Sequence, residues 1–156
     1  MGGFSGNNSS RVVIASSSVK ITKTGDTNEN IFVTVNIPPL QPNSIILITS
    51  QFSANNNANL KNAIIRFSGA AGTKYLDLSL NGSVNLCLQH VIQNRGVTNS
   101  QVGRPNIFGT FTLTATALVT SAVDTSVATT LVFAGLLANG ADSINLESYL
   151  VEIINP

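Results

Sequence analysis

The sequence is a succession of short β-type runs separated by turn signals, and this spacing restricts the fold more than any other feature. In NIFVTVNI (30–37) apolar residues fill every second position, which is the period of a half-buried strand. No 3.6-residue period persists long enough to indicate a helix. We therefore expect an all-β protein, an antiparallel β-sandwich in the form of a jelly roll of about eight to ten strands. The expected strands are 11–16, 19–24, 30–37, 45–52, 63–69, 74–80, 84–93, 107–119 and a closing hairpin within 131–156.

The length of the chain predicts one domain with an arm in front of it. A chain of 156 residues is long enough to bury a stable core. Residues 1–10 are mostly Gly, Asn and Ser with one Phe, a composition typical of a flexible segment. We expect residues 1–10 to form a flexible N-terminal arm and residues 11–156 to form a single jelly-roll domain.

The last strand of the closing hairpin has an alternation that leaves neither face cleanly polar. One face would carry Ile144, Leu146, Ser148, Leu150 and Glu152, and the other Asn145, Glu147, Tyr149, Val151 and Ile153. In an oligomer the second face can be buried against a neighbour, and each buried apolar side chain contributes roughly 1.5–3 kcal/mol. We therefore expect Tyr149, Val151 and Ile153 to form an oligomer interface. The alternative is that loops of the same chain cover them.

The charge of the chain excludes several classes of function. Only 10% of the residues are charged, against roughly 25% in an average domain. The eight Lys and Arg residues are scattered, so they form no basic patch for the phosphates that dominate nucleic-acid affinity. The apolar runs are too short to span a membrane. We expect no nucleic-acid or membrane partner, and a mostly uncharged surface that can pack closely against neighbours.

No segment carries a convincing catalytic motif. His90 is the single histidine, and Cys87 precedes it by three residues, which places the two on opposite faces of a strand. A thiolate–imidazole pair needs hydrogen-bond reach, which this spacing denies. SGAAGTKY (68–75) lacks the spacing of a phosphate-binding loop, so we expect a hairpin turn there. We expect packing roles for Cys87 and His90 in the core or at an interface, no cofactor and no enzymatic activity.

Two classes of ligand stay open as alternatives. Asp26 and Glu29 lie in an early loop and could supply oxygen ligands to a calcium ion, although Asp is also an ordinary turn former. Sugar sites commonly place an aromatic platform beside polar groups. The chain has no Trp and two Tyr, Tyr75 and Tyr149, for which strand packing is the competing interpretation.

Three stretches of the C-terminal half resemble small jelly-roll proteins of tailed bacteriophage particles. They are QNRGVTNSQVG (93–103), the Thr-rich GTFTLTATALVTSAVDTSVATTLVF (109–133) and LANGADSINLESYLVEII (137–154). The chain is similar there to trimeric phage appendage and capsid-decoration proteins, whose jelly rolls resemble the tumour-necrosis-factor type. The resemblance implies a structural protein of the virion, usually a homotrimer. Residues 1–85 carry no matching motif.

The sequence and the resemblance together predict a non-enzymatic capsid decoration (cement) protein that acts as a homotrimer on the virion. The arm would order on the major capsid protein or on a neighbouring subunit, with Phe4 and Arg11 as anchors. The competing prediction is a tail-fibre or tip protein that binds a receptor or a host surface glycan. Such a protein would use exposed loops, and the sequence offers residues 53–62 and 94–106.

Overall fold

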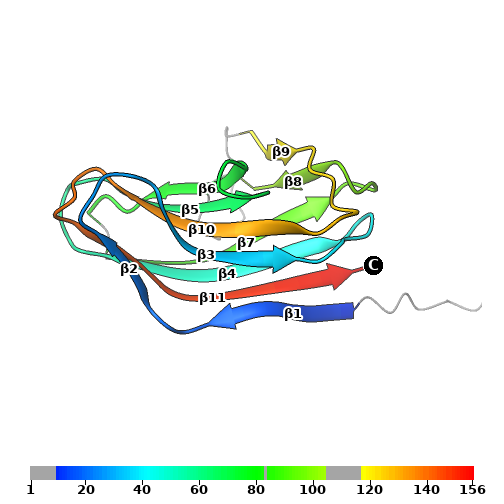
Figure 1. The fold of residues 1–156 in the computed structure, drawn as a ribbon, viewed down its shortest axis with the longest axis horizontal. Helices are drawn as coiled ribbons and strands as arrows, with labels where there is room; N and C mark the ends of the chain where they lie inside the picture. The colour runs from blue at the N-terminus through cyan, green and yellow to red at the C-terminus, as the bar shows by residue number, and fades with distance from the viewer. Residues whose placement is uncertain (1–9, 83, 105–116) are drawn as a thin grey trace, which may run out of the picture.

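The β-type runs form strands in the part of the chain that the structure, a computed structural model, describes: residues 10–82, 84–104 and 117–156. The strands of these residues pair into two antiparallel sheets that lie face to face (Figure 1). This confirms the predicted all-β sandwich and is consistent with a jelly roll. The strands are β1 (Ser10–Ser17), β2 (Ile21–Thr24), β3 (Asn30–Ile37), β4 (Ile45–Ala54), β5 (Lys61–Phe67), β6 (Thr73–Ser79), β7 (Asn85–Asn94), β8 (Gln101–Gly103), β9 (Val119–Ser121), β10 (Thr129–Leu137) and β11 (Ser143–Asn155).

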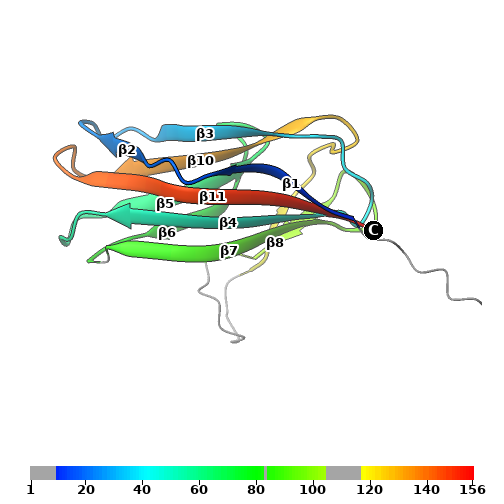
Figure 2. The ribbon, with the colours of Figure 1, turned by 90° about the horizontal axis from the view of Figure 1, so that it is seen from below.

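The two sheets differ in width. The seven-stranded sheet has the order β1-β11-β4-β7-β8-β9, and β2 also pairs with β11, beyond the end of β1. The four-stranded sheet has the order β3-β10-β5-β6. Figure 2 shows β11 running between β1 and β4. Among the described strands the chain crosses between the sheets six times, as it does in a jelly roll. The crossings follow β2, β3, β4, β6, β9 and β10.

The predicted strand positions agree well with the structure in the first half of the chain. β3 has the predicted bounds, β4 is two residues longer than predicted at its end, and β7 is shifted by one residue. The short strands β8 and β9 are not predicted, because three-residue strands carry too few residues for a periodic pattern. Residues 107–116 of the predicted strand 107–119 lie outside the described residues. No helix in the described ranges is long and apolar enough to cross a membrane.

The core lies between the inner faces of the two sheets. Ile46, Ile48 and Phe52 of β4 are at most 1% exposed, and so is Ser50 on the same face. The residues that alternate with them point away from the core, as the two-residue period of a strand requires. Phe67 and Tyr75 of the opposite sheet meet edge to face, with ring centroids 6.2 Å apart. Each such buried side chain contributes roughly 1.5–3 kcal/mol, so the packing of the two inner faces is a large source of stability.

A tight hairpin joins β5 and β6, as the sequence predicts for residues 68–75. Ser68 and Gly69 have positive φ angles of 72° and 83°. Gly72 lies so close to the end of β5 that a Cβ there would be 2.0 Å from the carbonyl oxygen of Phe67. A side chain at position 72 would therefore displace the backbone. This segment is a turn that leads into β6. It therefore lacks the helix N-terminus that a phosphate-binding loop supplies.

A β-bulge explains the irregular alternation of β11. The register with β4 shifts around Glu147, so the extra residue changes which positions face the core. Ile144 and Leu146 face inward before the bulge, and Val151 and Ile153 face inward after it. All four are at most 2% exposed. A strand read with one uninterrupted period of two therefore mixes its inner and outer residues from position 147 onward.

We expect Val151→Asp to lower the free energy of unfolding by about 4 kcal/mol or more, because it places an unpaired carboxylate in the core. Leu150→Asp is the matched control on the outer side of the same strand, with an expected loss of about 1 kcal/mol. Urea unfolding followed by circular dichroism at low protein concentration measures both values. Equal losses for the two variants would contradict the assignment of faces.

Candidate assembly surface

The outer face of the seven-stranded sheet is not covered by a third layer of described residues. Side chains that alternate with the core positions of β4, β7 and β11 point away from the other sheet. We call them the open face. Its apolar half, toward the C-terminus, consists of Val13, Ile45, Leu47, Val91, Leu150 and Ile154, and its polar half consists of Thr49, Gln51, Asn85, Cys87 and Gln89.

Strand register brings the apolar half together. Leu47 lies opposite Val91 on β7, and Ile45 lies opposite Ile154 on β11. These four side chains are partly exposed, and Val13 on the edge strand β1 is 56% exposed. A contiguous apolar area on the surface of a soluble protein marks an interaction site more often than a scattered set of apolar residues does.

An ion pair lies within this apolar half. Glu152 of β11 is 6% exposed, and its Oε1 accepts a hydrogen bond from Arg11 Nε at 2.7 Å. Arg11 Nη2 donates to Glu152 Oε2 at 2.5 Å, which makes the contact bidentate. These hydrogen bonds hold the pKa of Glu152 below its usual range. Because its charge is already paired within the chain, covering the open face would not leave this carboxylate unpaired.

A shallow depression extends the apolar half across β8 to the segment that precedes β9. It has a volume of about 290 Å³. Leu118 at its rim is 55% exposed, and Arg104 is also exposed. The depression could accept an apolar side chain from another molecule. It is lined by Val91, Gln93, Val102, Gly103, Arg104 and Leu118.

The chain itself covers the residues that the sequence predicts at an oligomer interface. Val151 and Ile153 are 0% and 2% exposed and belong to the core, and Tyr149 packs on Phe133 with ring centroids 5.2 Å apart. Val151 and Ile153 are therefore not available to a neighbouring subunit, and the predicted interface is corrected for these two residues. Tyr149 is partly exposed, and its interface role stays a prediction. The cover is the four-stranded sheet, and the bulge explains why the sequence pattern assigned the wrong face. Leu150 is the outward residue in this stretch.

Of the two residues predicted to anchor the arm, the structure describes Arg11 alone. Arg11 belongs to β1, and its guanidinium is bonded to Glu152 of the same chain. Phe4 and the other residues up to position 9 lie outside the described residues. The anchoring roles of Phe4 and Arg11 stay predictions.

Cys87 and His90 lie on opposite faces of β7, as their spacing predicts. His90 is 5% exposed and packs against Tyr75, with ring centroids 6.4 Å apart. No described residue forms a hydrogen bond with His90 Nε2. Burial in this apolar environment lowers the pKa of His90 to about 4. Cys87 is exposed on the open face, so the core role considered for it is excluded.

Neither tyrosine offers an aromatic platform for a sugar. Tyr75 is fully buried, and its hydroxyl lies 2.7 Å from Ser121 Oγ. Burial raises the pKa of Tyr75. Tyr149 is partly buried with its ring against Phe133. The packing interpretation of both tyrosines is therefore the correct one.

Asp26 and Glu29 each bind a different basic residue, which argues against a shared calcium site. Lys23 Nζ donates to Asp26 Oδ1 at 2.9 Å, and Asn30 Nδ2 donates to Asp26 Oδ2 at 3.1 Å. Hydrogen bonding, chiefly from Lys23, lowers the pKa of Asp26 to about 2. Glu29 faces Arg66 instead. Within the described ranges no group of three or more His, Cys, Asp or Glu residues could hold a metal ion.

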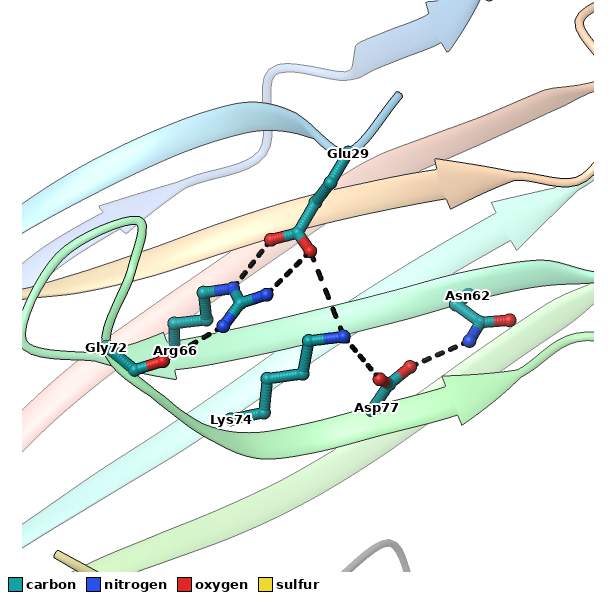
Figure 3. Close-up of polar contacts among 6 residues, drawn as sticks. All are labelled: Glu29, Asn62, Arg66, Gly72, Lys74 and Asp77. Atoms are coloured by element: carbon teal, nitrogen blue, oxygen red, sulfur yellow. Dashed lines mark hydrogen bonds and ion pairs between the residues drawn. The ribbon is translucent and has the colours of Figure 1, made fainter. Parts of the chain in front are cut away.

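Glu29 belongs to a charged network on the outer face of the four-stranded sheet (Figure 3). Its Oε1 and Oε2 accept hydrogen bonds from Arg66 Nε at 2.6 Å and Nη2 at 2.8 Å. Lys74 Nζ lies 3.9 Å from Glu29 Oε2 and donates to Asp77 Oδ2 at 2.6 Å. Asp77 also accepts a hydrogen bond from Asn62 at 2.7 Å. The sequence does not reveal the central ion pair of this network, since Glu29 and Arg66 are 37 residues apart along the chain.

The network shields a small second apolar cluster. Ile64, Val132 and Ala134 are at most 1% exposed although they face away from the main core. Glu29 precedes β3 and Arg66 lies on β5, so their ion pair reaches across β10, which lies between these strands. The charged side chains of the network therefore bind one another and cover the outer face of their own sheet. The apolar half of the open face has no comparable cover.

The Asn-rich segment that the sequence offers as an exposed binding loop is tied to its own chain. Asp142 Oδ1 accepts hydrogen bonds from the side-chain amides of Asn55 and Asn57. Lys61 is fully buried, and its Nζ donates to Asn57 Oδ1 and to the carbonyl oxygen of Asn59, both at 2.7 Å. Several amides of residues 53–62 therefore hold the loop to the turn before β11 and are engaged within the chain.

The apolar half of the open face was missed by sequence reasoning. The run IILI (45–48) is typical of a central strand buried on both faces. β4 is central, lying between β11 and β7, but only its inner residues are buried, and Leu47 is partly exposed. An apolar run on a strand with one uncovered face is the signal that could have revealed the surface.

Comparison with known proteins finds similar folds at low similarity. No protein-family model matches the sequence, and no curated protein matches it. A CBM2 module of the evolved Dit of Lactobacillus casei BL23 phage J-1 is similar, with 16% identity and a TM-score of 0.39 over 79% of this chain and 69% of that one.

A chain of infectious bursal disease virus, Gx strain, is also similar, with 10% identity and a TM-score of 0.44 over 96% of this chain. The present chain spans 33% of the length of that viral chain. With TM-scores below 0.5, these likenesses do not establish a function.

We expect Glu29→Gln to lower the free energy of unfolding by about 1 kcal/mol at pH 7. The ion pair with Arg66 holds the pKa of Glu29 below its usual value, so its stabilisation is present at neutral pH. It is lost as the pH falls below about 4, where the unfolded chain takes up the proton more readily. Urea unfolding at pH 7 and pH 3 measures the change. Glu147→Gln is the control, because it loses a 3.9 Å contact to Lys20 while its side-chain oxygen can still accept the hydrogen bond from Ser53.

His90 gives a second pH dependence in a different range. The unfolded chain protonates this imidazole near pH 6.5, whereas the folded protein resists protonation until about pH 4. Stability therefore falls between these two values, by at most about 3 kcal/mol. His90→Gln should flatten this part of the profile and leave the part below pH 4 unchanged. A variant with the wild-type slope between pH 6.5 and 4 would contradict the assignment.

Proposed function

We propose that the chain is a non-enzymatic structural protein of a phage virion, a cement protein that decorates the capsid as a homotrimer and contacts the major capsid protein. The observation that carries the proposal is the open face. It is a broad, nearly uncharged surface on a stiff β-sandwich, with an apolar half that the described residues leave uncovered. Such a surface suits permanent packing against protein neighbours better than chemistry on a small substrate.

The sequence resemblance supports the same function. The stretches that resemble phage decoration and appendage proteins include β8, β10 and β11, the last of which contributes Leu150, Glu152 and Ile154 to the outer side of the seven-stranded sheet. The resembling region therefore contributes to the open face itself. The virion location and the trimer belong to this proposal.

The proposed mechanism is stabilisation by added contacts. A protein that binds the assembled shell, and does not bind its dissociated subunits, shifts the equilibrium toward the shell by mass action. A preformed sandwich loses little conformational entropy on docking, because its strands are already fixed by the core. Neither step requires a catalytic group or a cofactor.

A tail-fibre or tip protein that binds a receptor or glycan is the second candidate, and one observation favours it. A depression of about 300 Å³ on the four-stranded sheet places apolar and polar side chains together. Amide and hydroxyl groups beside an apolar wall could bind a sugar. It is lined by Thr27, Leu60, Asn62, Leu136, Leu137 and Ala138.

Deleting the gene from the virus that encodes the chain separates the two candidates. For a cement protein we expect particles that assemble and adsorb normally but lose infectivity at a lower temperature, and recovery when purified protein is added back. For a tip protein we expect particles of normal heat stability that fail to adsorb. Particles unchanged in both heat stability and adsorption would contradict both functions.

A further inference from the structure

We propose that the open face is the contact between copies of this chain, with Leu47 and Val91 near its centre. The inference names the surface that joins the subunits and rests on the proposed function only for the number of subunits. It replaces the interface predicted from the sequence, whose residues Val151 and Ile153 are buried by the chain itself.

The chemistry of the open face makes it complementary to itself. The central strands β4 and β7 carry no Asp, Glu, Lys or Arg. The polar half consists largely of Thr, Gln and Asn side chains, whose hydroxyl and amide groups both donate and accept hydrogen bonds. Copies of such a surface can meet without bringing like charges together, whether two copies lie face to face or three surround an axis with each face shared between two neighbours. Copies of a charged surface would repel each other.

The charges that do lie on this face are compatible with burial. Glu152 is bonded twice by Arg11 of its own chain, so the pair enters a contact already neutralised. Glu147 lies toward the polar half and contacts Ser53 and Lys20. Both carboxylates therefore have partners before any second copy arrives.

The size of the face matches a stable contact between proteins. β4 pairs with β7 over Ile45–Ser53, a length of about 30 Å at 3.4 Å per residue. The four long strands from β1 to β7 span about 19 Å at 4.8 Å per strand. The resulting area is about 600 Å², of the same order as the roughly 800 Å² per partner of an ordinary specific interface.

Other occupants fit this surface less well. The described residues of the open face include no aromatic side chain, which a sugar would use as a platform. They include the guanidinium groups of Arg104 at the rim and of Arg11, which is already bonded to Glu152, and no cluster of basic groups that would hold phosphates. A protein surface that is equally uncharged and partly apolar fits best. A second copy of the chain presents such a surface, namely its own open face.

Leu47→Arg tests the contact, and Ile31→Arg is the matched control. Ile31 is also on a β-strand and is 49% exposed, but it belongs to the other sheet. Light scattering over a range of concentrations should give the wild type and Ile31→Arg a multiple of 16.3 kDa, three-fold for the proposed trimer. Leu47→Arg should give the mass of one chain. Val13→Arg, at an edge position that is 56% exposed, repeats the test with little risk to folding.

The single cysteine reports which face is covered. Cys87 is exposed on the open face of one chain, so assembly through this face should slow its reaction with a maleimide. We expect reaction at least about tenfold slower in the wild type than in Leu47→Arg, because the dissociated fraction alone reacts. Circular dichroism and urea unfolding confirm that each variant is folded.

Two results would overturn the inference. One is a wild type that stays a single chain at every concentration. The other is an oligomer whose thiol reacts as fast as that of Leu47→Arg. Sedimentation with virus particles measures whether the protein binds them, and so tests the proposed function separately. An oligomer with a protected thiol that does not bind particles would sink the cement function and keep the contact. A single chain that binds particles would rule out the contact and keep the cement function.

Discussion

The packing of one sheet on the other is the constraint on which the rest of the structure depends. Ile48 and Phe52 on one side and Phe67 and Tyr75 on the other remove their surfaces from water together, and no single sheet could do so alone. Once these inner faces meet, the period of two along each strand determines the outer faces as well. The open face and the charged network therefore consist of the residues that alternate with the core positions. The strand register that aligns the core also aligns them.

The sequence predicts the fold class because alternation and turn chemistry are local properties. The strand 30–37 can be read from eight residues, and the hairpin before Lys74 from its glycines. The faces of β11 cannot be read in this way, because the bulge around Glu147 is fixed by pairing with β4, about a hundred positions earlier in the chain. The ion pairs of Arg66 with Glu29 and of Arg11 with Glu152 depend in the same way on strands brought together by the fold.

The two outer surfaces of the sandwich treat charge differently. On the four-stranded sheet, Glu29, Arg66, Lys74 and Asp77 bind one another above a small apolar cluster. The charges of this network are therefore paired within one chain. The central strands of the seven-stranded sheet carry uncharged and apolar residues outward instead. Only 10% of the residues are charged, and several of them form ion pairs that hold loops and edge strands of the same chain. This distribution directs association toward one side of the molecule.

The pairing of β1 with β11 has a consequence for how the chain is made. Ser10 lies opposite Asn155, so the first strand waits for the last one to be synthesised before it gains a partner. β11 also lies between β1 and β4, which means that the middle of the seven-stranded sheet is filled last. Contacts of such long sequence separation close slowly. Until then β4 presents an uncharged, unpaired edge to other nascent chains, and such edges invite wrong pairing. Correct folding therefore requires that the edge of β4 stay free of other partners until β11 has been synthesised.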